Sequence, residues 1–146
     1  MTVDIDKYLG TWYEFARIKN NFEPNFKNVT AQYLMQIDGS IKVINSGFVN
    51  GELKQIIGTA IKTDNDNVLK VSFFPDVYSE YRILFVDDDY QYALVGGEDK
   101  NHLWMLARNN NFNKDIYNKF INIALSYNYN VENLIFDEII KFGNYK

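Results

Sequence analysis

The chain has 146 residues, 47% of them hydrophobic, and carries a formal net charge of −4 with a pI near 4.9. This size predicts one compact domain over residues 1–146, and the acidic balance excludes the basic surface with which a protein binds nucleic acid or an anionic membrane. The absence of cysteine excludes disulfides, thiolate metal sites and a cysteine nucleophile.

The N-terminal segment MTVDID (1–6) contains two acidic residues and lacks both the basic and the apolar part of a secretory leader. If a leader has been removed, we expect a periplasmic or outer-membrane-associated protein. Otherwise we expect a soluble, cytoplasmic one. Membrane contact is expected only through a lipid anchor on such a leader. The sequence contains no apolar run of about 18 residues that could span a bilayer.

Most of the chain shows the two-residue periodicity of half-buried β-strands. After a strand at 9–18 and a loop at 19–28, the segment VTAQYLMQI (29–37) alternates apolar and polar residues. The turn residues DGS then separate it from IKVINSGF (41–48), which predicts a hairpin. Further strands are predicted at 53–62, 68–74, 80–86, 90–96 and 102–108. Short strands at this spacing are typical of an antiparallel sandwich or barrel.

One segment after these strands has helical periodicity. Its apolar residues recur at three- and four-residue steps from Ile116 to Tyr127, and Asn113 suits the N-cap position. The apolar stripe predicts that this helix packs on the outside of the sheet. A final short strand is predicted at 133–138.

Five sequence blocks occur in the order and spacing of a known family. They are GTWYE (10–14), DGSIKVINSG (38–47), LKVSFFP (69–75), YALVGG (92–97) and LWMLAR (103–108). Together they resemble the lipocalins, and most closely the branch of bacterial lipocalins and apolipoprotein D. The family's Thr-Asp-Tyr motif is replaced by VDDDYQY (86–92). The resemblance implies an all-β fold: an eight-stranded antiparallel up-and-down β-barrel, with one C-terminal α-helix packed outside and a final short strand.

The resemblance also implies a structural role for the Gly-x-Trp block. In lipocalins this tryptophan closes one end of the barrel and an arginine of the eighth strand covers its ring, which corresponds to Trp12 and Arg108 here. A guanidinium over an indole ring contributes roughly 0.5–2 kcal/mol. Gly10 would let the backbone approach without a side chain in the way. We therefore expect Gly10, Trp12 and Arg108 to form a barrel floor that does not select a ligand.

Alternation along the strands predicts which side chains enter the lumen. If Trp12 points inward, Glu14 and Ala16 do as well. The resemblance adds Tyr78 near the open end, together with Trp104. The ligand-binding candidates are Tyr33, Met35, Phe73, Tyr78, Tyr81, Ile83, Tyr92, Leu94, Trp104 and Leu106.

Glu14 is the carboxylate of most interest, because alternation points it into an apolar lumen. It is expected either to form an ion pair with Arg108 at the floor or to carry a raised pKa of the kind found at active sites. The ion pair is the preferred alternative.

The loop at 19–28 contains Phe22 and Phe26 on either side of Pro24. The two phenylalanines are lid candidates, since such a loop can fold over the open end of a barrel. The alternative is an ordinary hydrophobic cluster under a long loop.

These features predict binding, storage or transport of small hydrophobic ligands in the lumen, above all fatty acids or lysophospholipids. Burial of about ten methylenes gains about 8 kcal/mol before ordering costs, which can reach micromolar affinity. The hydroxyls of Tyr78, Tyr81 and Tyr92 are the expected donors to a carboxylate or phosphate head. Two alternatives stay open: a lipid-modifying enzyme that uses the lumen, and a protein-interaction module with a filled barrel.

We predict no enzymatic activity, no cofactor and no metal site. His102 is the only histidine, the acidic run Asp87–Asp89 lacks the spacing of a calcium loop, and no Gly-x-Ser-x-Gly motif occurs. The expected partner is a fatty acid or lysophospholipid, and no nucleic acid. Bacterial members of the branch are known as dimers, which implies a homodimer here as well.

Overall fold

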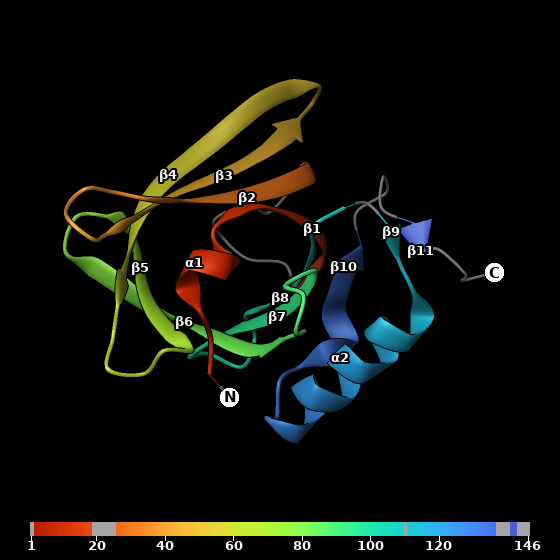
Figure 1. Ribbon diagram of the computed structural model, residues 1–146. Coiled ribbons are helices and arrows are strands. Elements are labelled where there is room, and N and C mark those ends of the chain that lie inside the picture. The colour runs from red at the N-terminus through yellow and green to blue at the C-terminus, as the bar shows by residue number, and fades with distance from the viewer. Residues whose placement is uncertain (1, 19–25, 110, 137–140, 143–146) are drawn as a thin grey trace.

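The structure is a computed structural model that describes residues 2–18, 26–109, 111–136 and 141–142. Its main feature is a closed antiparallel β-barrel (Figure 1). Each barrel strand pairs with the next along the chain, and the first also pairs with the eighth, so the sheet closes on itself. The predicted up-and-down barrel is therefore confirmed. The strands are β1 (Gly10–Ile18), β2 (Lys27–Met35), β3 (Ile41–Val49), β4 (Glu52–Lys62), β5 (Val68–Phe74), β6 (Val77–Val86), β7 (Tyr92–Gly97) and β8 (Leu103–Ala107).

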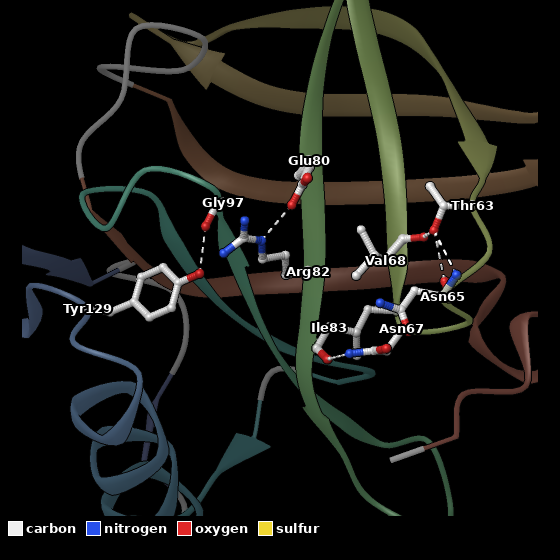
Figure 2. Close-up of polar contacts among 9 residues, drawn as sticks. All are labelled: Thr63, Asn65, Asn67, Val68, Glu80, Arg82, Ile83, Gly97 and Tyr129. Atoms are coloured by element: carbon white, nitrogen blue, oxygen red, sulfur yellow. Dashed lines mark hydrogen bonds and ion pairs between the residues drawn. The ribbon is translucent and has the colours of Figure 1, made fainter.

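Short turns with specific chemistry connect the strands. Asn50 and Gly51 between β3 and β4 have positive φ angles of 53° and 82°, which Asn-Gly adopts readily in two-residue hairpins. Between β4 and β5, Thr63 Oγ1 donates to the carbonyl of Val68 at 2.7 Å and accepts the backbone N–H of Asn65 at 3.1 Å (Figure 2). These local bonds hold the ends of neighbouring strands in register.

Two helices flank the barrel. The single-turn helix α1 (Ile5–Tyr8) lies across one end of the barrel, and α2 (Lys114–Ser126) lies outside its wall (Figure 1). The side chain of the N-cap Asn113 accepts the backbone N–H of Ile116 at 2.8 Å, as the sequence predicted. The outer helix is confirmed, whereas α1 was not predicted, because one turn is too short to show periodicity. Of the helices in the described residues, none is long and apolar enough to cross a membrane.

Shorter elements follow the barrel strands. A 3₁₀ turn, η1 (Val131–Asn133), leads into β10 (Leu134–Phe136), which pairs with the end of β1 and is the predicted final strand. A second, unpredicted pair forms where β9 (Asn111–Phe112) and β11 (Lys141–Phe142) run parallel to each other. β10 thus extends the barrel sheet beside β1.

Tyr129 ties the segment after α2 to the barrel. Its hydroxyl donates to the carbonyl of Gly97 at 2.5 Å (Figure 2). Its ring occupies the space next to Gly96, where an added Cβ would lie 2.5 Å from the ring. The missing side chain at Gly96 therefore allows the ring to pack directly on β7.

The apolar side chains form two clusters separated by the barrel wall. The inner cluster surrounds Tyr8 and Trp12 in the lumen. The outer cluster lies between α2 and the strands β1, β6, β7 and β8, with Phe15, Met105 and Phe120 fully buried in it. The helix thus covers part of the barrel wall and holds these strands from outside, which leaves the lumen as a separate interior.

Candidate functional site

The end of the barrel below α1 is closed by Trp12, which is completely buried. The guanidinium carbon of Arg108 lies 3.8 Å from the centroid of the Trp12 ring. Trp12 Nε1 donates to the carbonyl of Tyr8 at 2.8 Å. Gly10 has a φ of 99°, and an added Cβ there would lie 3.4 Å from Arg108 Nη1. The structure therefore brings Gly10, Trp12 and Arg108 together at one end of the barrel.

Three tyrosine hydroxyls form a cluster above this floor. The Tyr81 hydroxyl lies 2.5 Å from that of Tyr8 and 2.9 Å from that of Tyr33. Burial, reinforced by the neighbouring Tyr33, raises the pKa of both Tyr8 and Tyr81 well above the ordinary 10.0. The cluster therefore forms a hydrogen-bonded, uncharged deep end of the lumen at physiological pH.

Beyond the tyrosines the lumen contains a cavity of about 90 Å³, whereas one water requires roughly 10–15 Å³. Its mouth lies at the β5–β6 hairpin, where Phe74 and Val77 line the cavity and are also more than half exposed. Five of the ten predicted ligand-binding residues line it, and Ile83 is buried in the adjoining inner cluster. The five are Tyr33, Phe73, Tyr81, Trp104 and Leu106. Other lining residues are Glu14, Ala31, Val43, Asn45, Val71, Ser79, Glu80 and Val95.

A β-bulge in β1 changes which side chains enter the lumen. Glu14 lies opposite Leu106 of β8, the register then shifts before Ala16, and Arg17 lies opposite Trp104. Because directly opposed residues share a face, Glu14 and Arg17 both point inward, while Ala16 belongs to the outer cluster. The inward orientation that simple alternation predicted for Ala16 is therefore wrong.

The bulge brings two opposite charges together inside the barrel. Arg17 Nη1 lies 3.4 Å from Glu14 Oε1, and each side chain is 5% exposed. Arg17 Nη2 also donates to the carbonyl of Phe26 at 3.2 Å. The expected pairing of Glu14 with Arg108 is wrong, because Arg108 directs its donors to backbone carbonyls at the floor.

Tyr92 and Leu94 point away from the lumen, contrary to the prediction. The β7 residues in the inner cluster are Ala93 and Val95, which lie opposite inward residues of β8. Tyr92 and Leu94 pack in the outer cluster with α2. Alternation failed here because both faces of this strand are covered, so large apolar residues occur on both of them.

Met35 and Tyr78 also lie outside the cavity lining. Met35 ends β2 on the α1 side of the barrel and is partly exposed. Tyr78 lies at the hairpin beside the mouth, but its neighbours Val77 and Ser79 line the cavity, so Tyr78 faces the other way. Of the three hydroxyls expected to meet a head group, only that of Tyr81 therefore belongs to the cavity.

Of the two lid candidates, Phe22 lies outside the described residues. The ring of Phe26 packs against Gly47 on β3, where an added Cβ would lie 2.5 Å from the ring atom Cδ2. Gly47 is buried, so the missing side chain at this position makes room for Phe26.

Sequence analysis missed Tyr8 and Arg17 as lumen residues. Tyr8 enters from a single helical turn, for which no periodic signal exists. Arg17 enters through the bulge. A charged residue between Ala16 and Ile18 in a strand with an apolar outer face could have indicated this, since a buried charge requires a partner.

The geometry defines a class of protein: an up-and-down barrel closed at one end, with an apolar cavity wide enough for one small ligand. Residues 3–138 match the family model described as the Lipocalin-like domain. The chain therefore belongs to the lipocalin family, and this fold supports binding of small hydrophobic ligands.

Similar proteins occur in a virus, bacteria, a plant and animals. A lipocalin of Acanthamoeba polyphaga mimivirus is 35% identical over 142 residues, covering 92% of this chain and 83% of its own length. The outer membrane lipoprotein Blc of Vibrio cholerae is 36% identical over 138 residues, covering 91% of this chain and 81% of its own. Apolipoprotein D of Cavia porcellus is 31% identical over 142 residues, covering 90% and 74%. The resemblance to this branch of the family is confirmed.

Solved structures share the architecture. Lobster apocrustacyanin A1 aligns with a TM-score of 0.73 at 18% identity, covering 90% of this chain and 77% of that one, and this likeness shows the fold alone. The cockroach allergen Per a 4 aligns with a TM-score of 0.70 at 26% identity, covering 92% and 88%.

Proposed function

We propose that the protein binds and carries a single-chain lipid, either a fatty acid or a lysophospholipid, with the acyl chain in the barrel cavity. The observation that carries this proposal is the apolar cavity itself, with Val43, Val71 and Leu106 on its wall and Trp104 beside them. Each buried methylene gains about 0.8 kcal/mol, so the chain supplies most of the driving force.

The charges around the cavity favour an orientation with the head group at the mouth. Among the described lining residues, Glu14 is the one whose charged side chain points into the lumen, because Glu80 alternates with the inward residues Ser79 and Tyr81 and so faces away. Each glutamate is already bonded to an arginine: Glu14 to Arg17, and Glu80 to Arg82 at 2.7 Å (Figure 2). An anionic head inside the lumen would compete with the Glu14 carboxylate for Arg17, whereas at the mouth it keeps its hydration.

The proposed activity is binding without chemical conversion of the ligand. The enzyme alternative depended on Glu14 or a tyrosine as the reacting group. Glu14 is bonded to Arg17. Tyr8 and Tyr81 share a hydrogen bond, and their raised pKa values oppose ionisation. This arrangement supports a carrier.

We propose a periplasmic or outer-membrane setting, because relatives in Vibrio cholerae and Escherichia coli are named outer membrane lipoproteins. Detection of the native protein in fractionated cells tests this location. The homodimer stays a prediction, and sedimentation velocity over a range of protein concentrations would test it.

Titration of tryptophan emission with a lysophospholipid and with the matching fatty acid tests the carrier proposal. The chain has two tryptophans: Trp12 is sealed at the floor and Trp104 lines the cavity. A saturable change that disappears in Trp104→Phe is expected, with a dissociation constant in the micromolar range or below. The ratio of the two affinities reports the preferred head group. A folded protein that responds to neither lipid would contradict the proposal.

A matched pair of variants locates the binding site. Val43 and Ile44 are neighbours on β3, but Val43 lines the cavity whereas Ile44 lies outside the lining. Val43→Phe should fill the cavity and weaken lipid binding by about tenfold or more, equivalent to about 1.4 kcal/mol. Ile44→Phe should leave the affinity unchanged. Equal effects of both substitutions would place the lipid elsewhere.

A further inference from the structure

The hairpin between β5 and β6 exposes three apolar side chains within five residues. Phe74 is 62% exposed, Val77 57% and Tyr78 51%. Single exposed apolar residues are ordinary on protein surfaces, but a group at one hairpin tip indicates a contact site. We call these three residues the apolar lip.

The apolar lip is continuous with the cavity. Phe74 and Val77 are paired across the hairpin, and both also line the cavity. Tyr78 lies beside them on the opposite face of β6, outside the lining. A lipid chain that leaves the cavity therefore passes Phe74 and Val77 before it reaches water.

We propose that the apolar lip docks on the surface of a neutral lipid bilayer and that the ligand is exchanged in this docked state. This inference rests on the proposed carriage of single-chain lipids. In the docked state the acyl chain would move between two apolar environments without crossing water, which removes the main cost of its transfer. Tyr78 is suited to the bilayer interface, since its ring is apolar and its hydroxyl can stay hydrated.

The size and charge of the lip favour a bilayer over a protein partner. A stable protein interface buries about 800 Å² on each partner, which three side chains at a tip do not supply, whereas shallow insertion requires only a few apolar side chains. Asp76 is the only charged residue between Phe73 and Ser79. The hairpin therefore lacks the cations that an anionic membrane would attract, and zwitterionic phosphatidylcholine is the matching surface.

Transfer kinetics test the proposal directly. A fluorescent fatty acid is loaded on the protein, and its transfer to phosphatidylcholine vesicles is followed by stopped flow. If transfer takes place in a docked state, the rate should rise with vesicle concentration and depend little on salt. Tyr78→Asp should lower this rate by about tenfold, because a charge must then enter the bilayer surface. Its equilibrium affinity should not change, because Tyr78 does not line the cavity.

Ile37 provides the matched control. It is fully exposed, but it lies in the turn between β2 and β3, on the α1 side of the barrel. Ile37→Asp should leave the transfer rate unchanged, because this end does not carry the cavity mouth. An equal loss of transfer rate in Tyr78→Asp and in Ile37→Asp would overturn docking through the apolar lip.

The remaining outcomes separate this inference from the carrier proposal. Saturable lipid binding with a transfer rate independent of vesicle concentration would overturn docking and leave carriage standing. If no lipid is bound at all, carriage fails, and flotation of the ligand-free protein with phosphatidylcholine vesicles tests docking alone. Flotation that is lost in Tyr78→Asp would support docking, and absence of flotation would overturn it. A Tyr78→Asp variant that loses only self-association would assign the lip to a second copy of the chain and overturn the bilayer.

Discussion

The guanidinium carbon of Arg108 lies 3.8 Å above the ring centroid of Trp12, and the same side chain bonds three separate segments. Its Nε donates to the carbonyl of Tyr90 at 3.0 Å. Nη1 and Nη2 each donate at 2.9 Å, to the carbonyls of Thr11 and Lys7 respectively. One arginine thus joins α1, β1 and the turn before β7 at the closed end of the barrel.

Replacing this arginine should lower the stability of the closed end of the barrel, while the cavity lining is left unchanged because Arg108 is not part of it. Arg108→Met should lower the free energy of unfolding in urea by about 2–4 kcal/mol, because it removes the contact with Trp12 and several charge-assisted hydrogen bonds. Arg108→Lys keeps the charge but not the planar fork, so its loss should be intermediate. If Arg108→Met were as stable as the parent, the hydrogen bonds of Arg108 at the floor would make no net contribution to the free energy of unfolding.

The buried pair of Glu14 and Arg17 should show strong coupling in a double-mutant cycle. Arg17→Met leaves a buried carboxylate without its arginine and should cost about 3–5 kcal/mol in urea unfolding. The double variant Glu14→Gln/Arg17→Met should be more stable than Arg17→Met alone, since no unpaired charge remains. Additive losses would contradict a direct interaction between the two side chains.

Gly96 should tolerate no side chain, because Tyr129 occupies the space. Gly96→Ala should lower the free energy of unfolding by about 1–3 kcal/mol through overpacking. Tyr129→Phe keeps the ring but loses the bond to the carbonyl of Gly97, so we expect a smaller cost of about 1 kcal/mol. Thermal unfolding compares the two, and a neutral Gly96→Ala would indicate that the segment after α2 moves freely away from β7.

The paired tyrosines Tyr8 and Tyr81 should make the fold sensitive to high pH. Their pKa values in the native state are raised above 10.0 because burial opposes the phenolate. Above pH 10 the unfolded chain loses these protons while the native state keeps them, so stability is complete below this pH and falls as the pH rises. The loss can reach about 1.4 kcal/mol per pH unit for each tyrosine.

Urea unfolding from pH 8 to 11 measures this effect. Tyr8→Phe removes one of the tyrosines with a raised pKa and should make the decline shallower. Phenolate absorbance should show that Tyr8, Tyr81 and Tyr129 ionise at higher pH in the native protein than after unfolding, because burial raises the pKa of all three. A decline of equal slope in the parent and in Tyr8→Phe would contradict the assignment of Tyr8.

The sequence alone determined the elements with a strong repeating pattern. The two-residue periodicity located the barrel strands, and three- and four-residue steps located α2. The Gly-x-Trp block and the arginine of the last barrel strand indicated the floor, and the structure brings Trp12 and Arg108 into contact. These features are local or belong to a family motif, so they are visible without knowledge of the packing.

Tertiary structure decided which faces of the strands meet the ligand. In β7 the outer helix buries Leu94, and the two faces become indistinguishable by composition. In β1 a bulge reverses the alternation and turns Arg17 toward Glu14. Tyr8 reaches the lumen only because α1 folds across the end of the barrel. Each of these orientations depends on contacts between segments distant in sequence, and a pattern of neighbouring residues carries no information about such contacts.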